Sequence, residues 1–194
     1  MGEVYEPRED SELLKCEVCK IVKPGMRVLD MGTGTGVLAF AAAAYGGDVL
    51  AVDVNPEAVA LVGLHIEKAR IENVEARVSN LFSAIGETER FDVILCNPPY
   101  LLNDPHDPDP ALDGGPTGVE FIARFVHDAK KHLKEHGKIL LLFSSFTNKE
   151  RVDRVLKENG YYFFERAQLA MFMERLYVYE LSAKPMRTHD EEKR

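Results

Sequence analysis

Seven short apolar runs alternate with segments of helical periodicity along most of the chain. The runs at 26–31 and 48–54 are apolar almost throughout, as parallel strands are when helices cover both faces of their sheet. The runs at 161–167 and 174–183 have no helix between them, which indicates a closing antiparallel hairpin. The pattern therefore predicts a doubly wound α/β fold with a mostly parallel seven-stranded sheet and an antiparallel final strand.

The other strands are expected at 74–78, 90–96 and 137–145, and the helices at 9–22, 36–45, 55–71, 118–136 and 148–159. The chain has 194 residues and no repeats, so we expect a single domain over 1–182 with an N-terminal helical segment at 1–24. The polar residues 183–194 are expected to form a flexible tail. No apolar run suits a membrane span or a secretory signal, so a cytoplasmic location is expected.

Charge and cysteine content narrow the possible functions. The formal net charge is −8, which argues against a large nucleic-acid surface, because duplex binding depends on Lys and Arg that neutralise phosphates. Cys16 and Cys19 have the spacing of half a zinc site, but no second pair follows. At this helical spacing both thiols are expected to pack on one buried face, so no metal site is predicted.

A glycine-rich turn, "VLDMGTGTG", joins the first strand of the sheet to a helix. Gly32 and Gly34 allow a ligand to approach the backbone, and Asp53 at the end of the next strand can accept hydrogen bonds from ribose hydroxyls. A dinucleotide fingerprint would need glycine where Val37 stands, and the charge of Asp30 does not suit a pyrophosphate. The pattern favours a cationic sulfonium cofactor, S-adenosylmethionine (AdoMet).

The third strand leads into Asn80 and Leu81. Asn80 can hydrogen-bond an adenine amino group, and Leu81 can pack on the adenine ring or offer its backbone amide. The alternative interpretation is that Asn80 is only a turn residue at the end of a strand.

The fourth strand ends in "NPPY", residues 97–100. The Asn97 side-chain oxygen and the Pro98 carbonyl can accept from the two N–H groups of a planar amide or amine. The two prolines make this pair of acceptors rigid before a substrate arrives, and Tyr100 can offer a flat face. The alternative is that the prolines simply end a strand.

Together, "YEPREDS", "DMGTGTG", "AVDVNP", "SNLF", "NPPY" and "LDGGPTG" resemble the HemK-like class I methyltransferases, and most closely their short archaeal and eukaryotic branch. The resemblance covers nearly the whole chain to about residue 182. It implies a Rossmann-like methyltransferase fold. It also implies methylation of the glutamine side-chain amide in the Gly-Gly-Gln loop of a peptide-chain release factor.

The resemblance assigns roles by position. It implies that AdoMet is contacted by Ser11, Asp30, Gly32, Gly34, Asp53, Asn80, Leu81 and Asn97. It implies that the glutamine is held by Asn97, Pro98, Pro99 and Tyr100, of which Asn97, Pro98 and Tyr100 are the catalytic set. The active-site wall would include Tyr5, Glu6 and Pro7. The family usually has Asp at the position of Asn80, so the cofactor affinity is in question here, and the reaction type is not.

Short members of this family resemble one half of a heterodimer with a small zinc-binding activator, which covers a sheet edge by strand addition. Here the run 74–78 would be that edge. The alternative is a short edge strand that its own charges protect.

The NPPY motif is also found in enzymes that methylate adenine in DNA or RNA. The loop at 101–115 carries acidic residues and no Lys or Arg, which favours a basic protein surface over phosphates. Those residues are Asp104, Asp107, Asp109 and Asp113. A protein-glutamine substrate is therefore preferred. An adenine exocyclic-amine methyltransferase acting on RNA or DNA is the alternative, and a non-catalytic AdoMet-fold scaffold is a third hypothesis.

Overall fold

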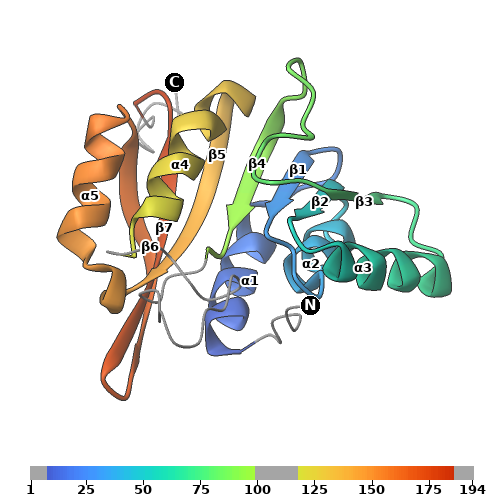
Figure 1. The fold of residues 1–194 in the computed structure, drawn as a ribbon, viewed down its shortest axis with the longest axis horizontal. Helices are drawn as coiled ribbons and strands as arrows, with labels where there is room; N and C mark the ends of the chain where they lie inside the picture. Colours follow the sequence, from blue (N-terminus) through green and yellow to red (C-terminus); the bar gives the residue numbers. More distant parts are fainter. Residues whose placement is uncertain (1–7, 99–117, 186–194) are drawn as a thin grey trace, which may run out of the picture.

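The computed structural model describes residues 8–98 and 118–185, which form a seven-stranded sheet with helices on both faces (Figure 1). The strands lie in the order β3-β2-β1-β4-β5-β7-β6. Their bounds are β1 Arg27–Met31, β2 Asp48–Asp53, β3 Val74–Val78, β4 Phe91–Cys96, β5 Leu133–Ser144, β6 Tyr162–Met171 and β7 Glu174–Ser182. The strands β1 to β5 are parallel, whereas β7 is antiparallel to both of its neighbours. The predicted fold class is confirmed.

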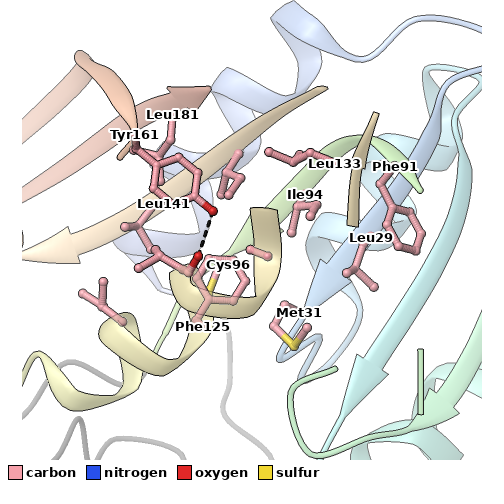
Figure 2. Close-up of a cluster of buried hydrophobic side chains, with 14 of the residues drawn as sticks. Leu29, Met31, Phe91, Ile94, Cys96, Phe125, Leu133, Leu141, Tyr161 and Leu181 are labelled. Atoms are coloured by element: carbon pink, nitrogen blue, oxygen red, sulfur yellow. Dashed lines mark hydrogen bonds between the residues drawn. The ribbon is translucent and has the colours of Figure 1, made fainter. Parts of the chain in front are cut away.

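The helices divide into two layers, and alternate residues of the strands face one layer or the other. On one face, Val28 packs with α1 (Glu9–Ile21), α2 (Val37–Ala44) and α3 (Pro56–Ala69). On the other, Leu29 and Ile94 lie in a core with α4 (Glu120–Ala129) and α5 (Lys149–Glu158). Figure 2 shows this second core, in which Met31 and Cys96 mark the ends of β1 and β4. Because a fully buried aromatic side chain such as Phe125 contributes about 3–5 kcal/mol relative to Ala, these layers hold the strand ends firmly.

A network of ion pairs connects the helix α1 to the C-terminal strands β6 and β7. Arg166 of β6 donates from Nε to Glu17 of α1 at 2.8 Å and from a terminal nitrogen to Glu180 of β7. Glu17 and Glu180 are 3% and 1% exposed, so Arg166 bridges two carboxylates that have little access to water. Burial alone would raise the pKa of Glu17, but hydrogen bonds from Lys20 and Arg166 lower that pKa below its usual value.

One predicted helix was too long. The segment expected as a helix over 118–136 is helical only as α4 and a short 3-10 turn, Lys130–His132, and β5 begins at Leu133. Leu133 pairs with Phe91 of β4 and is 8% exposed. A Cβ atom at Gly137 would lie 2.7 Å from the Phe91 carbonyl oxygen, so the extended chain lies close against β4 there. Strand pairing thus overrides the helical propensity of this charged segment.

The prediction for the cysteines was also wrong. Cys16 is exposed and Cys19 is half-buried, whereas Leu14 and Val18 occupy the buried face of α1. Among the residues that the structure describes, no group of three or more metal-binding side chains comes together. Within 8–98 and 118–185, none of the helices combines the length and the apolar character needed to cross a membrane.

Candidate active site

The candidate site lies where the carboxyl ends of β2, β1 and β4 meet. Met31 pairs with Val52 on one side and with Cys96 on the other. Gly32 and Asn97 each follow directly, so the glycine loop and the NPPY segment start abreast of one another. Ligands of doubly wound sheets bind at this edge, and the sheet thus brings together most of the predicted residues.

The glycine loop is tied to the end of β2. The backbone amides of Gly32 and Thr33 both donate to the Val52 carbonyl at 2.9 Å, and the Gly34 amide donates to Asp53 Oδ2 at 2.9 Å. Gly32 and Gly34 have φ values of 75° and 53°, in the left-handed region that favours glycine. A Cβ atom added to Gly32 would meet no atom of residues 8–98 and 118–185 within 4 Å, so these residues leave room for a ligand at this glycine.

Asp30 is a buried acid with one unused oxygen. Its Oδ2 accepts from the Thr33 hydroxyl at 2.7 Å and from the Ala39 amide at 3.1 Å. Its Oδ1 is buried and has no hydrogen-bond partner within the described part of the chain. Burial raises the pKa of Asp30 to about 7, and the nearby charge of Asp53 adds to this effect. A positively charged ligand at Oδ1 would favour the ionised form, as expected for the amino group of AdoMet.

Asp53 lies half-buried at the end of β2 and is already positioned by backbone amides. Its Oδ1 accepts from the Asn55 amide at 2.8 Å, and its Oδ2 accepts from Gly34. A carboxylate oxygen has more than one acceptor position, so both oxygens can still receive hydroxyl groups. The predicted ribose contact therefore fits this geometry.

The segment after β3 has a fixed backbone but an exposed Asn80. The Ser79 hydroxyl donates to the Leu81 carbonyl at 2.6 Å and accepts from the Ala84 amide at 3.0 Å. Leu81 has a positive φ of 49°, and its side chain packs against the core below α4. The backbone amide of Asn80 donates to Ser83 Oγ and its carbonyl accepts from the Ser83 amide, each at 3.1 Å. The exposed side chain of Asn80 can therefore meet a ligand from solvent.

Asn97 is held in one orientation by an acidic residue that the sequence did not single out. Its Nδ2 donates to Asp10 Oδ2 at 3.0 Å, while its Oδ1 is buried and unpaired among the residues that can be described. Asp10 is 2% exposed, and its Oδ1 accepts from the Ser11 amide at 2.6 Å. The sequence signal for Asp10 was its place in "YEPREDS", directly before the predicted cofactor residue Ser11, which is 3% exposed.

Of the other predicted site residues, Pro98 is buried directly after Asn97, and the rest lie outside the residues that the structure describes. Burial, with Asp30 nearby, raises the pKa of the Cys96 thiol, so Cys96 stays neutral and is no nucleophile at neutral pH. The predictions that fall outside the described residues concern Tyr5, Glu6, Pro7, Pro99, Tyr100 and the acidic loop with Asp104, Asp107, Asp109 and Asp113.

The fold and the site define a class I methyltransferase: a glycine loop after β1, an acid at the end of β2 and an antiparallel β7 between β5 and β6. The chain belongs to the methyltransferase small domain family, whose model matches residues 11–179. It is 36% identical over 184 residues to a candidate protein N5-glutamine methyltransferase of Methanocaldococcus jannaschii. The matched region covers 91% of this chain and 90% of that protein. The HemK-like resemblance is thereby confirmed.

Two further relatives show the same family. The chain is 35% identical over 167 residues to the release factor glutamine methyltransferase of Salmonella typhimurium, with 80% of this chain and 60% of that protein covered. It therefore spans less than two thirds of this bacterial relative. A chain of the E. cuniculi Mtq2–Trm112 complex, responsible for the methylation of the eRF1 translation termination factor, superposes with a TM-score of 0.73 and 28% identity. That match covers 93% of this chain and 98% of the other.

Proposed function

We propose that this protein transfers a methyl group from AdoMet to the side-chain amide of the glutamine in the Gly-Gly-Gln loop of a peptide-chain release factor. The relatives with release-factor and N5-glutamine activities in their names support this substrate. The observation that carries the proposal is the buried Oδ1 of Asn97, which has no partner among the described residues and lies at the same sheet edge as the glycine loop. A buried acceptor without a donor costs about 1–3 kcal/mol, and a substrate NH2 group would supply that donor.

The residues at the strand ends fit AdoMet as the cofactor, which when bound supplies a methyl group activated by its sulfonium. Asp30 Oδ1 offers an unused negative oxygen for a cationic amino group, and Asp53 offers acceptors for ribose hydroxyls. Gly32 and Gly34 have the positive φ values that let a ligand approach the backbone, and Asn80 and Leu81 would contact the adenine, as the family resemblance implies. Ser11 and Asn97 complete the proposed set.

The chain's own chemical task is to align a planar nitrogen. Asn97 Oδ1 and the Pro98 carbonyl would accept from the two N–H groups, which holds the nitrogen in place and favours its pyramidal form. Pro99 keeps the backbone of this pair rigid, and Tyr100 would cover the flat face of the amide. Held in this way, the nitrogen would lie in reach of the methyl carbon that AdoMet would supply, with the sulfonium sulfur as the leaving group. The methylated nitrogen would pass its extra proton to water.

We also propose that the edge strand β3 receives a strand from a small partner protein. The complex of the neighbour Mtq2 with Trm112 supports the existence of a partner. β3 ends the sheet on one side. Val49 donates to the Asn73 carbonyl and Ser79 donates to the Asp53 carbonyl, so the odd-numbered residues of β3 bond to β2. The backbone groups of Val74, Ala76 and Val78 therefore face outward and suit strand addition. The zinc of that partner is part of this proposal.

Residues 1–182 are proposed to form one methyltransferase domain, since the sheet runs from Arg27 to Ser182.

The test is transfer from AdoMet with a labelled methyl group to the release factor, with and without a Trm112-like protein from the same source. We expect label on the Gly-Gly-Gln glutamine, no label when that glutamine is replaced by Ala, and a loss of about 100-fold or more in Asn97→Ala. Transfer to naked RNA or DNA with none to the release factor would instead support the adenine methyltransferase. Full biological function of Asn97→Ala would favour a scaffold.

A further inference from the structure

Asp10 lies in the first turn of α1, 87 residues before its partner Asn97. Each of its oxygens has a donor: Oδ1 accepts from the Ser11 amide at 2.6 Å, and Oδ2 accepts from Asn97 Nδ2 at 3.0 Å. The side chain is almost fully buried at 2% exposure. A buried carboxylate thus sits directly behind the amide that the reaction needs.

The two ends of a carboxamide have nearly the same shape, so packing alone does not decide which end points at a substrate. The prolines fix the backbone at Asn97 but leave the rotation of its terminal amide undecided. An ionised carboxylate has only acceptors, so it attracts Nδ2 and repels Oδ1. If the amide of Asn97 turned over, its oxygen would lie against Asp10 Oδ2 and its donor would face the incoming NH2 group.

We propose that Asp10 is a positioning residue that orients Asn97, so that the site accepts a group with two N–H donors. This inference rests on the proposed function for its catalytic consequence. Asp10 acts through Asn97 and need not touch the substrate itself. It also makes the site selective, because a substrate group that presents only acceptors finds no donor at Asn97 Oδ1.

The variant Asp10→Asn tests this idea because it has the same shape but only one acceptor oxygen for the two donors described above, the Ser11 amide and Asn97 Nδ2. The Ser11 amide is the nearer donor and is fixed in the helix, so the new side chain should turn its oxygen to Ser11 and its NH2 to Asn97. The Asn97 amide should then turn over and present a donor to the substrate. The helix itself should stay folded, since Leu14, Val18 and the Glu17–Arg166 ion pair hold it.

The experiment compares wild type, Asp10→Asn, Asn97→Ala and the double variant in methyl transfer to the release factor. We expect kcat to fall about 100-fold in Asp10→Asn, as for the loss of one aligned hydrogen bond. The AdoMet Kd should change by less than about fivefold, because Asn97 is only one of the proposed AdoMet contacts. In the Asn97→Ala background, Asp10→Asn should cause less than about a twofold further loss, because the two residues act as a unit. Glu9→Gln, an exposed acid in the same turn, is the control for lost charge and should keep the wild-type kcat.

A wild-type kcat in Asp10→Asn, an equal loss in both backgrounds, or a loss in AdoMet affinity in place of kcat would overturn the proposal. A second readout needs no substrate: the side-chain amide signals of Asn97 in 15N-labelled protein, assigned by their absence in Asn97→Ala. Hydrogen bonding to Asp10 should protect one of these protons from exchange, and Asp10→Asn should remove that protection. This measurement still decides the role of Asp10 if the wild-type protein does not methylate a release factor.

Discussion

The buried side chain of Asp30 lowers the stability of the protein when it is ionised, and the same charge would favour the binding of a cationic ligand. Two donors bond to its Oδ2, whereas its Oδ1 is buried with no partner among the described residues, and burial raises the pKa of the group to about 7. Since this folded-state pKa exceeds the usual value of 3.8, the folded protein binds more protons than the unfolded chain between these pH values. The free energy of unfolding contributed by Asp30 is therefore present at low pH and is lost as the pH rises to about 7.

We predict that Asp30→Asn removes this pH dependence. Asn keeps an acceptor for Thr33 and Ala39 but cannot ionise. Relative to wild type, its free energy of unfolding should rise by about 2 kcal/mol between pH 5.5 and pH 8, measured by urea denaturation. In the wild type, the increase in Tm caused by AdoMet should grow as the pH rises through about 7. In Asp30→Asn this growth with pH should be absent. A parallel pH dependence in the two proteins would contradict the assigned pKa.

At the scale of elements, the exposed backbone of β3 makes a specific prediction about partner binding. Ala76→Pro removes an N–H that faces outward, so it should leave the ladder between β2 and β3 in place while blocking an added strand. Co-purification with a Trm112-like protein should fall about tenfold or more, as expected for the loss of a hydrogen bond together with a local kink. Ala76→Ser keeps the N–H and should bind like wild type; equal binding by Ala76→Pro would place the partner elsewhere.

The sequence predicted the elements well where a strand is buried on both faces, as in β1, β2 and β4, because such a strand has a continuous apolar run. It failed over 130–136, where "KKHLKEH" has helical propensity but Leu133 pairs with β4. The strand β6 also extends beyond the expected 167 to Met171, because it pairs with β7 as far as Glu174. Local patterns cannot reveal such pairing, since the partner strand supplies the deciding hydrogen bonds.

The same limit explains which site residues were found. Asp30, Gly32 and Asp53 lie in compact motifs with fixed spacing, so the sequence placed them at one edge of the sheet. The Asp10–Asn97 contact joins positions 87 residues apart, and the Arg166–Glu17 contact joins positions 149 apart. Neither pair has a spacing that local structure fixes, so only the packed fold brings them together.

At the scale of the whole molecule, Arg166 joins α1 to the two C-terminal strands, since it contacts Glu17 of α1 and Glu180 of β7. Replacing Arg166 by Met leaves the buried Glu17 and Glu180 with Lys20 and Lys138 as remaining partners. We predict that the free energy of unfolding falls by about 2–4 kcal/mol, less than for a buried pair that loses its only partner. AdoMet binding and kcat should weaken as well, because α1 carries Asp10 and Ser11.

The measurement is urea denaturation at neutral pH, with Arg175→Met as the matched control. Arg175 is exposed on the same hairpin, and its replacement should change the free energy of unfolding by less than about 0.5 kcal/mol. An Arg166→Met protein as stable as this control would show that apolar packing alone holds α1.

The position of β7 inside the sheet, between β5 and β6, has a consequence for biosynthesis. The helix α1 contacts α2 and also the strands β5, β6 and β7, and these strands emerge from the ribosome later than every motif of the site. A nascent chain that already contains the glycine loop and Asn97 therefore lacks part of the surface that holds α1, and with it Asp10, in place. Activity should appear abruptly, once translation has passed residue 182, and prematurely terminated products should be inert.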